Sequence, residues 1–117
     1  MSLRKEQSEF AARVPFLILK ALDIGYEVTL GDAYRDPRAP YGSPSSKHKR
    51  RLAIDINLFR DGEYLTETSD HTKLGEFWES IGGVWGGRFN DGNHYEAPDH
   101  GAWKQELKEL ELKWEWL

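Results

Sequence analysis

Residues 46–57 have the sequence Ser46-Lys47-His48-Lys49-Arg50-Arg51-Leu52-Ala53-Ile54-Asp55-Ile56-Asn57. A carboxylate, Asp55, lies here inside an apolar segment, and burying a charge without a partner is costly. Strand alternation would place Asp55 and Asn57 on one face and the leucine and isoleucine side chains on the other. The apolar face can then pack on a core while the polar face lines a site, and His48 can fold back toward Asp55.

A histidine and a carboxylate supply two of the three protein ligands of a catalytic zinc site, whose fourth position is left for water. The missing ligand should be another histidine. The chain has four histidines: His48, His71, His94 and His100. His94 follows Asp91 by three residues across a Gly-Asn turn signal, so one short segment offers a ligand and a possible base. The alternative is a buried hydrogen bond between His48 and Asp55 without a metal.

Composition narrows the class of protein. The chain has 117 residues and no cysteine, so we expect one domain over residues 1–117 without disulfides or thiolate chemistry. The formal net charge of −4 argues against a nucleic-acid partner. No apolar run approaches the ~20 residues of a membrane span, and the first residues lack a signal-peptide core. We therefore expect a monomer that is made in a cytoplasm and does not span a membrane.

Hydrophobic residues at three- and four-residue spacing predict three helices. The first covers residues 3–24, where Pro15 either kinks the helix or begins a second one. The second covers 71–81 and places His71 in its first turn, as a surface or capping residue. The third covers 100–117, and its tryptophans either cover the core or form a partner surface.

Alternating apolar residues and turn signals predict the strands. These strands cover residues 26–32, 53–59 and 93–97, with a short return strand over 63–65 after an Asp-Gly turn. Residues 31–44 are a loop by composition, and a long loop in a small domain is usually functional or disordered.

Two basic features flank the predicted site. Arg35 follows the first strand directly, where a rigid guanidinium suits carboxylate recognition or charge stabilisation. It could instead be a surface residue paired with Asp32 or Asp36. The basic run of residues 47–51 is either a solvated face or a rim that attracts an acidic substrate.

Several short motifs together resemble the M15 metallopeptidases: Ser46-x-His48, Ala53-x-Asp55, Trp85-Gly86-Gly87 and Asp91-x-x-His94. This family contains D-Ala-D-Ala carboxypeptidases and dipeptidases together with phage L-alanyl-D-glutamate endopeptidases. The Trp-Gly-Gly element and the small size are most similar to the phage endolysins. The resemblance implies an α+β fold, with a small antiparallel sheet flanked by helices, like the Hedgehog and DD-peptidase folds.

The resemblance also implies roles for individual residues. His48, Asp55 and His94 would bind one zinc ion. Asp91 would be the general base, and Arg35 would lie near the substrate carbonyl or carboxylate. Further residues are expected to line the site or to contact substrate: Ser46, Asn57, Trp85 and Tyr95.

The implied activity is hydrolysis of peptide bonds in peptidoglycan stem peptides by a phage endolysin. Such an enzyme is made in the host cytoplasm and acts on the cell wall in the periplasm after release. A D-Ala-D-Ala carboxypeptidase and a non-catalytic zinc module that binds peptidoglycan remain open as alternatives. Glu96 is a possible acceptor for the second ring nitrogen of a ligand histidine. Arg51 stands where many relatives have glycine, so we expect the backbone between the first two ligands to differ.

Overall fold

The computed structural model describes residues 1–43 and 45–114. In this part of the chain the helices are α1 (Leu3–Asp23), α2 (Thr72–Ser80) and α3 (Leu107–Lys113). The strands are β1 (Glu27–Leu30), β2 (Ala53–Arg60), β3 (Glu63–Leu65), β4 (Val84–Trp85) and β5 (His94–Glu96). Short 3-10 turns connect them: η1 (Lys47–Arg50), η2 (Thr68–His71), η3 (Gly86–Phe89) and η4 (Asp99–Gly101).

β2 is the centre of an antiparallel sheet with the order β1-β2-β5-β4. β1 pairs with β2 from Leu30 opposite Ile56 onward, and β5 pairs with the beginning of β2. β3 pairs with the end of β2, because a hairpin turn reverses the chain directly after that strand. The predicted α+β fold with a small antiparallel sheet flanked by helices is therefore confirmed.

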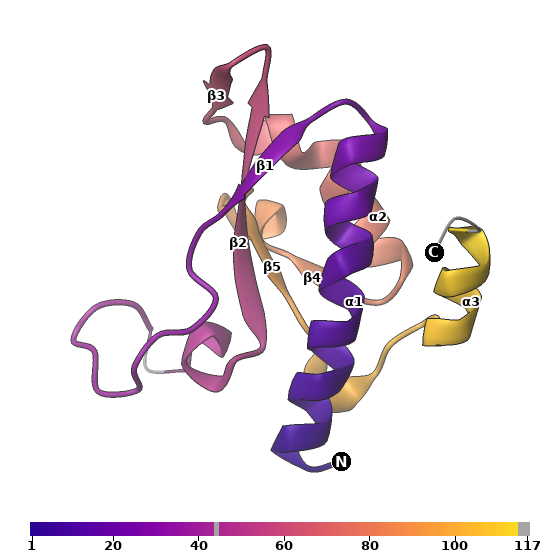
Figure 1. Cartoon of the computed structure of the whole chain (residues 1–117). Helices are drawn as coiled ribbons and strands as arrows, with labels where there is room; N and C mark the ends of the chain where they lie inside the picture. The colour runs from indigo at the N-terminus through magenta and orange to yellow at the C-terminus, as the bar shows by residue number, and fades with distance from the viewer. Residues whose placement is uncertain (44, 115–117) are drawn as a thin grey trace.

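The helices cover one face of the sheet. In Figure 1 they lie on one side of β1 and β2, and the loop before η1 lies on the other side. The core between the helices and the sheet contains the predicted apolar face of β2 together with residues from the helices and from the other segments of the chain. Its buried members are Phe10, Phe16, Leu17, Ala21, Leu52, Ile54, Ile56, Leu58, Leu74, Trp78, Ile81, Trp85, Tyr95, Ala97 and Leu110. The polar face of β2 is thus left open on the side of the loop.

α1 is a single helix. The side chain of Ser2 accepts a hydrogen bond from the Lys5 N–H at 3.1 Å and caps the first turn. Pro15 lies inside the helix, and α1 continues to Asp23, so the two-helix alternative was wrong. Gly25 follows with φ of 96°, a left-handed conformation that ends the helix without the steric cost of a Cβ.

The tail differs from the helix predicted over residues 100–117. His100 takes a left-handed φ of 56° and is followed by Gly101 at 68°, which interrupts a helix, so α3 begins only at Leu107. Residues 115–117 of the predicted helix and position 44 of the predicted loop lie outside the described residues. Trp103 packs edge-on against Trp78 with ring centroids 5.3 Å apart, so this tryptophan covers the core.

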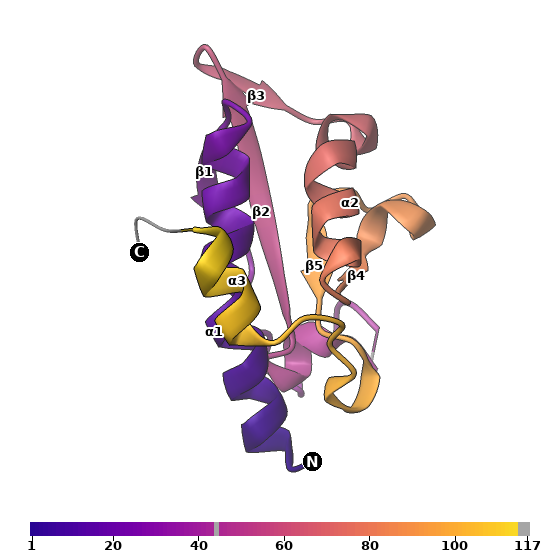
Figure 2. The ribbon, with the colours of Figure 1, turned by 90° about the vertical axis from the view of Figure 1, so that its right-hand side faces the viewer.

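Figure 2 shows α3 in front of α1, with α2 to the right. Leu110 of α3 is buried in the core, and Arg13 of α1 donates a hydrogen bond to the Gln105 carbonyl, just before α3, at 2.8 Å. Within the described residues, every helix is too short or too polar to cross a membrane.

Candidate active site

Two of the predicted ligands face each other across neighbouring strands. Asp55 of β2 and His94 of β5 are direct partners in the antiparallel register. Because Ile54 and Ile56 are buried in the core, alternation directs Asp55 to the open face, and an opposite partner shares that face. The His94 Nδ1 atom lies 3.5 Å from Asp55 Oδ1.

The third predicted ligand comes from the turn before β2. Ser46 begins η1, and its hydroxyl accepts a hydrogen bond from the His48 N–H at 3.3 Å. Arg51 ends η1 with a φ of 58°, a conformation that glycine adopts more easily than arginine does. The backbone thus makes a glycine-like turn despite the arginine. His48 folds back as expected, and its Nε2 atom lies 3.1 Å from Asp55 Oδ1.

The three candidate ligand atoms have the spacing of a metal site. His48 Nε2 and His94 Nδ1 are 3.2 Å apart, and they lie 3.1 Å and 3.5 Å from Asp55 Oδ1. A tetrahedral centre with bonds of about 2.0–2.1 Å has neighbouring ligand atoms about 3.3–3.4 Å apart. Two nitrogens and one carboxylate oxygen at these separations can hold a metal ion.

His94 is oriented by a carboxylate on its other side. Its Nε2 atom lies 2.7 Å from Glu96 Oε1, and the second oxygen of Glu96 is paired with Lys47 Nζ at 3.0 Å. A carboxylate in this position fixes the ring of a metal-binding histidine and raises its basicity. Among the described residues, no hydrogen-bond partner is found for the buried Nδ1 atom of His48. A partner for the ring nitrogen that does not face the cluster is therefore present for His94 but not, among the described residues, for His48.

The protonation of the metal-free cluster follows from these contacts. Burial opposes a charge on His94, but hydrogen bonds with Asp55 and Glu96 outweigh burial and raise the pKa of His94 to about 9. Burial would also raise the pKa of Glu96, but hydrogen bonds from His94 and Lys47 hold that pKa below its usual value. A metal ion that binds His94 at pH 7 must therefore displace a proton.

Asp91 lies beside the cluster rather than inside it. Its Oδ2 atom is 4.0 Å from His94 Nδ1, and its side chain is 53% exposed. The Asp91 N–H donates to the Gly86 carbonyl at 2.9 Å, and its own carbonyl accepts from the His94 N–H at 3.1 Å. A Cβ on Gly86 would overlap the Asp91 carbonyl, so only glycine permits this close approach.

An open cavity of about 430 Å³ adjoins the cluster. Its lining comes from the loop, η1, β2, η3 and β5: Arg35, Gly42, Ser43, Ser45, Ser46, Lys47, His48, Asp55, Phe89, Asp91, His94 and Glu96. The structure therefore brings six predicted residues to one cavity: Arg35, Ser46, His48, Asp55, Asp91 and His94.

Arg35 forms part of the cavity wall and has weak contacts on both sides. Its guanidinium lies 3.4 Å from Asp32 Oδ2 and 3.5 Å from Ser46 Oγ, and it lies over the ring of Tyr41 at 5.3 Å. The pairing with Asp32 that the sequence left open is present, yet the guanidinium still faces the cavity. Both long contacts could be exchanged for a substrate carboxylate or carbonyl oxygen.

Residues 41–97 match a family model of the M15 peptidases, described as D-alanyl-D-alanine carboxypeptidase. The match contains His48, Asp55, Asp91 and His94, the same residues that the structure places around one point. The segment formed by residues 41–97 therefore belongs to the M15 peptidase family. Arg35 lies outside the matched segment, so its assignment depends on the cavity geometry. No curated protein matches the chain.

The basic run of residues 47–51, which contains the candidate ligand His48, is mostly engaged in side-chain contacts. Lys47 Nζ donates to the Ala97 carbonyl at 2.6 Å besides its pairing with Glu96, and Lys49 Nζ donates to the Ala39 carbonyl at 3.1 Å. Arg51 stacks over Tyr34 at 4.1 Å. The run is therefore neither a simple solvated face nor a free basic rim.

The Trp-Gly-Gly element packs against the turn that carries Asp91. The indole of Trp85 is buried between Gly75 of α2 and Gly87 of η3, where a Cβ on either glycine would overlap the ring. Its N–H donates a buried hydrogen bond to the Gly92 carbonyl at 2.7 Å. Gly92 directly follows Asp91, so Trp85 is a positioning residue and does not line the cavity.

Replacing Trp85 with phenylalanine should cost about 1–3 kcal/mol of stability, because the buried Gly92 carbonyl loses its donor. It should also lower kcat, because Asp91 is no longer held in place. The matched control is Trp103→Phe: among the described residues the Trp103 Nε1 atom is buried without a partner. Chemical denaturation and steady-state kinetics of both variants test this. Equal losses in the two variants would show that the hydrogen bond to Gly92 has no special role.

Two further residues that were predicted to contact substrate, Tyr95 and Asn57, are not part of the cavity lining. Tyr95 is fully buried, because it alternates with His94 and Glu96 on β5 and so faces the core. Asn57 continues the open face beyond Asp55, where its Oδ1 accepts long hydrogen bonds of 3.4 Å from Tyr64 and Asn93. The structure thus places Trp85 and Tyr95 in the core and Asn57 beside the cavity.

Phe89 lines the cavity without having been predicted, and Lys47, which also lines it, was expected only as part of the basic run. Phe89 packs edge-on against His94 with ring centroids 5.9 Å apart and is 56% exposed, so it supplies an apolar wall. Its place two residues after Gly87 was the only signal in the sequence. Lys47 precedes His48 directly, but only the fold shows that it pairs with Glu96.

His71 differs from the predicted surface or capping residue. It is buried, and its Nδ1 lies 2.7 Å from the Tyr95 hydroxyl. It comes at the start of α2 but makes no side-chain capping hydrogen bond. Burial lowers the pKa of His71 to about 4, against a smaller opposing effect of Asp70.

His71 should make the protein sensitive to acid. The folded state binds this proton less readily than the unfolded state does, so stability is lost as pH falls from about 6.5 toward 4, by roughly 3 kcal/mol at most. Urea denaturation of metal-free protein at several pH values should show that His71→Gln removes this part of the acid dependence. Parallel pH curves for variant and wild type would contradict the expectation.

Proposed function

We propose that the protein is a zinc-dependent peptidase that cleaves stem peptides of bacterial peptidoglycan, as an L-alanyl-D-glutamate endopeptidase of the phage endolysin type. The observation that carries the proposal is the convergence of His48, Asp55 and His94 on one point, with Asp91 beside it in an open cavity. Two imidazoles and a carboxylate leave a tetrahedral metal with one free position, which is typical of catalytic rather than structural zinc sites.

Each residue of the cavity has a chemical role in this proposal. Zinc bound by the three ligands would supply Lewis-acid polarisation of a carbonyl and of a water molecule. Asp91 is exposed, so it can accept a proton from the attacking water and return it to the leaving amine. The guanidinium of Arg35 can balance the negative charge that develops on the carbonyl oxygen. Glu96 holds the ring of His94 in the required orientation.

A D-Ala-D-Ala carboxypeptidase is the second candidate. The matched family model carries this description, and Arg35 on the cavity wall suits the terminal carboxylate of such a substrate. A non-catalytic zinc module is less consistent with the site, because binding alone gives no reason for an exposed acid 4.0 Å from a ligand nitrogen.

The setting of the activity is part of the same proposal. As in the phage endolysins that the sequence resembles, we infer synthesis in the host cytoplasm, release with the help of a holin-type partner, and action on the wall in the periplasm. The enzyme would act as a monomer on peptidoglycan peptides, without nucleic acid.

The test is mass spectrometry of purified peptidoglycan digested by the zinc-loaded protein, by chelator-treated protein, and by treated protein with zinc restored. Cleavage between L-Ala and D-Glu that disappears with the chelator and returns with zinc would support the endopeptidase. Release of terminal D-Ala alone would establish the carboxypeptidase. Absence of any product from protein that holds stoichiometric zinc would leave the binding module as the better explanation.

A further inference from the structure

Lys47 connects the two segments that carry the ligand histidines. It directly precedes His48 on η1, and its side chain reaches the end of β5, the strand that begins with His94. Its Nζ atom lies 3.0 Å from Glu96 Oε2, and only 15% of the Lys47 side chain is exposed. One partly buried ion pair therefore joins the two ligand-bearing segments.

The Lys47 ammonium group lines the active-site cavity, but oxygen atoms of the protein already surround it. Besides its pairing with Glu96, it lies 3.0 Å from Asp99 Oδ1 and donates to the Ala97 carbonyl at 2.6 Å. An ammonium group has three hydrogen atoms to donate, and three oxygens take them here. Lys47 is therefore better suited to hold these oxygens in place than to bind a substrate.

The backbone of Lys47 is held as well. Its carbonyl accepts a hydrogen bond from the Leu52 N–H at 2.9 Å, and the Leu52 carbonyl accepts one from the Ala97 N–H at 2.8 Å. These two bonds tie η1 and the end of β5 to the residue that precedes β2. The side chain of Lys47 thus extends from a fixed position.

Lys47 acts directly on the Glu96 carboxylate. Oε2 of this carboxylate faces Lys47, and Oε1 lies 2.7 Å from His94 Nε2. Because both oxygens are engaged, the carboxylate is held in one orientation, and the ring of His94 keeps its Nδ1 atom toward Asp55 and His48. A carboxylate held in this way fixes the tautomer and the orientation of a metal-binding histidine.

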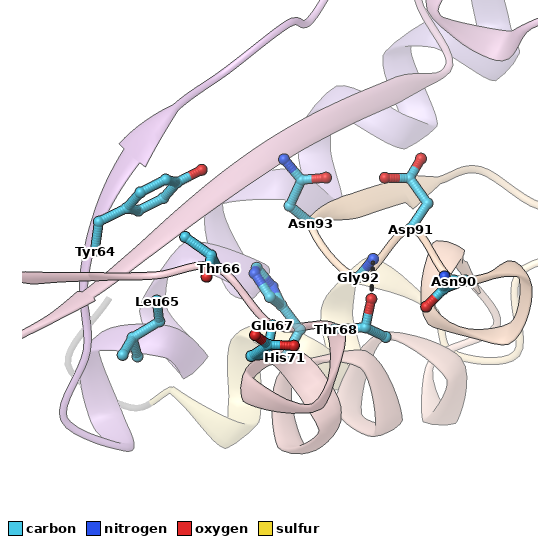
Figure 3. Close-up of a pocket in the computed structure, with 10 residues that line it drawn as sticks. All are labelled: Tyr64, Leu65, Thr66, Glu67, Thr68, His71, Asn90, Asp91, Gly92 and Asn93. Carbon is cyan, nitrogen blue, oxygen red and sulfur yellow. Dashed lines mark hydrogen bonds between the residues drawn. The ribbon is translucent and has the colours of Figure 1, made fainter.

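Burial alone does not give a histidine of this chain such a partner. His71 lines a second cavity, of about 200 Å³, which Figure 3 shows. It is more deeply buried than His94, with 3% against 7% of the residue exposed, yet its Nδ1 atom meets the neutral hydroxyl of Tyr95 at 2.7 Å. The ion pairs of histidine among the described residues involve His48 and His94. The succession of lysine, carboxylate and histidine is therefore a feature of the metal cluster.

We propose that Lys47 is a positioning residue of the metal centre, which strengthens zinc binding through Glu96 and His94 without being a ligand itself. The proposal rests on the metal site of the proposed function and not on the identity of the substrate. Without Lys47, the Glu96 carboxylate can turn away from His94, and the ring loses its fixed orientation. The metal is then held less tightly although all three ligands remain.

The test measures the zinc affinity of the folded protein by competition with a chromophoric chelator, in the absence of substrate. Lys47→Met should weaken zinc binding by about tenfold or more, which is the usual effect of removing an outer partner of a metal ligand. Lys47→Gln can still donate to the Ala97 carbonyl, so it disturbs the fold less and should show the same loss. Wild-type affinity in both variants would overturn the proposal.

Lys49→Met is the matched control. Lys49 is also buried and also adjoins His48, but its Nζ atom donates to the Ala39 carbonyl, and it forms no ion pair among the described residues. The control should therefore keep wild-type zinc affinity. An equal loss of affinity in Lys49→Met and Lys47→Met would show a general effect of burying a new side chain beside His48, and would contradict the proposal.

A double-mutant cycle shows whether Lys47 acts through Glu96. Glu96→Gln alone should weaken zinc binding, and adding Lys47→Met should cause little further loss, because the same link is already broken. Fully additive losses would mean that Lys47 acts by another route, and would overturn the proposal.

The ring of His94 supplies a second readout. In zinc-loaded wild type its Nε2–H proton should exchange slowly with water and give an NMR signal, because it donates a hydrogen bond to Glu96. Lys47→Met should broaden or remove this signal, and Lys49→Met should retain it. An unchanged signal in Lys47→Met would contradict the positioning role.

These measurements are independent of the proposed peptidase activity. If Lys47→Met weakens zinc binding but the zinc-loaded wild type cleaves no stem peptide, the peptidase function fails and the role of Lys47 stands. If stem peptides are cleaved but Lys47→Met keeps wild-type affinity, the role of Lys47 fails and the peptidase function stands. A wild type that binds no zinc would overturn both.

Discussion

Replacing Asp91 with asparagine should lower kcat by about 10²–10⁴-fold and leave the metal in place. Asparagine keeps the shape of the side chain but cannot accept a proton from water. The side chain lies outside the ligand triangle, because its Oδ2 is 4.0 Å from His94 Nδ1 while Asp55 Oδ1 is 3.1 Å from His48 Nε2. Steady-state kinetics on a purified stem peptide, together with metal analysis of the same sample, would measure both properties.

Asp61→Asn is the matched control for the Asp91 variant. Asp61 lies in the exposed turn after β2 with a φ of 52°, a conformation that asparagine accepts readily. This control should keep both activity and metal. Wild-type kcat in Asp91→Asn would mean that another group is the base, whereas loss of zinc would place Asp91 among the ligands.

The alternation of β2 was the most informative feature of the sequence. It correctly separated the buried Ile54 and Ile56 from Asp55 on the open face, because period-two alternation fixes sidedness wherever one face is buried. Alternation also implied that Tyr95 points away from His94 on β5, so its assignment to a substrate contact overlooked a rule that the sequence already supplied.

Contacts between distant segments could not be predicted from the sequence. The pairing of Lys47 with Glu96, the hydrogen bond from Trp85 to Gly92, and the second cavity each require the final positions of separate loops. The close approach at Gly86 illustrates the limit. A glycine in the sequence signals conformational freedom, but not which carbonyl it lies against.

The C-terminal segment from residue 100 shows that local helix propensity does not fix the backbone either. Apolar residues at helical spacing predicted one helix from residue 100, but His100 and Gly101 both take left-handed φ values. The interruption lets Trp103 pack edge-on against Trp78. Tertiary packing of a large aromatic residue therefore decided the backbone conformation over a weak helical preference.

Removing a ligand should abolish metal binding together with activity. We expect His48→Ala, Asp55→Ala and His94→Ala each to lose stoichiometric zinc, because each removes one corner of the triangle of 3.1, 3.2 and 3.5 Å. A metal ion that binds only the folded state adds about 4 kcal/mol of stability at about 1,000 times its Kd, so we expect wild type to show this gain with zinc and the variants to lose it. Thermal denaturation with and without zinc measures this gain independently of catalysis.

His100→Asn is the matched control for the ligand variants. His100 is exposed and lies outside the cluster, and asparagine accepts its left-handed φ of 56°. It should keep wild-type zinc content, activity and the stabilisation by zinc. His94→Ala should have the largest effect among the three ligand variants, because among the described residues it also leaves Lys47 as the only ionic partner of the half-buried Glu96. Equal zinc content in wild type and all three ligand variants would disprove the ligand set, whatever their activities.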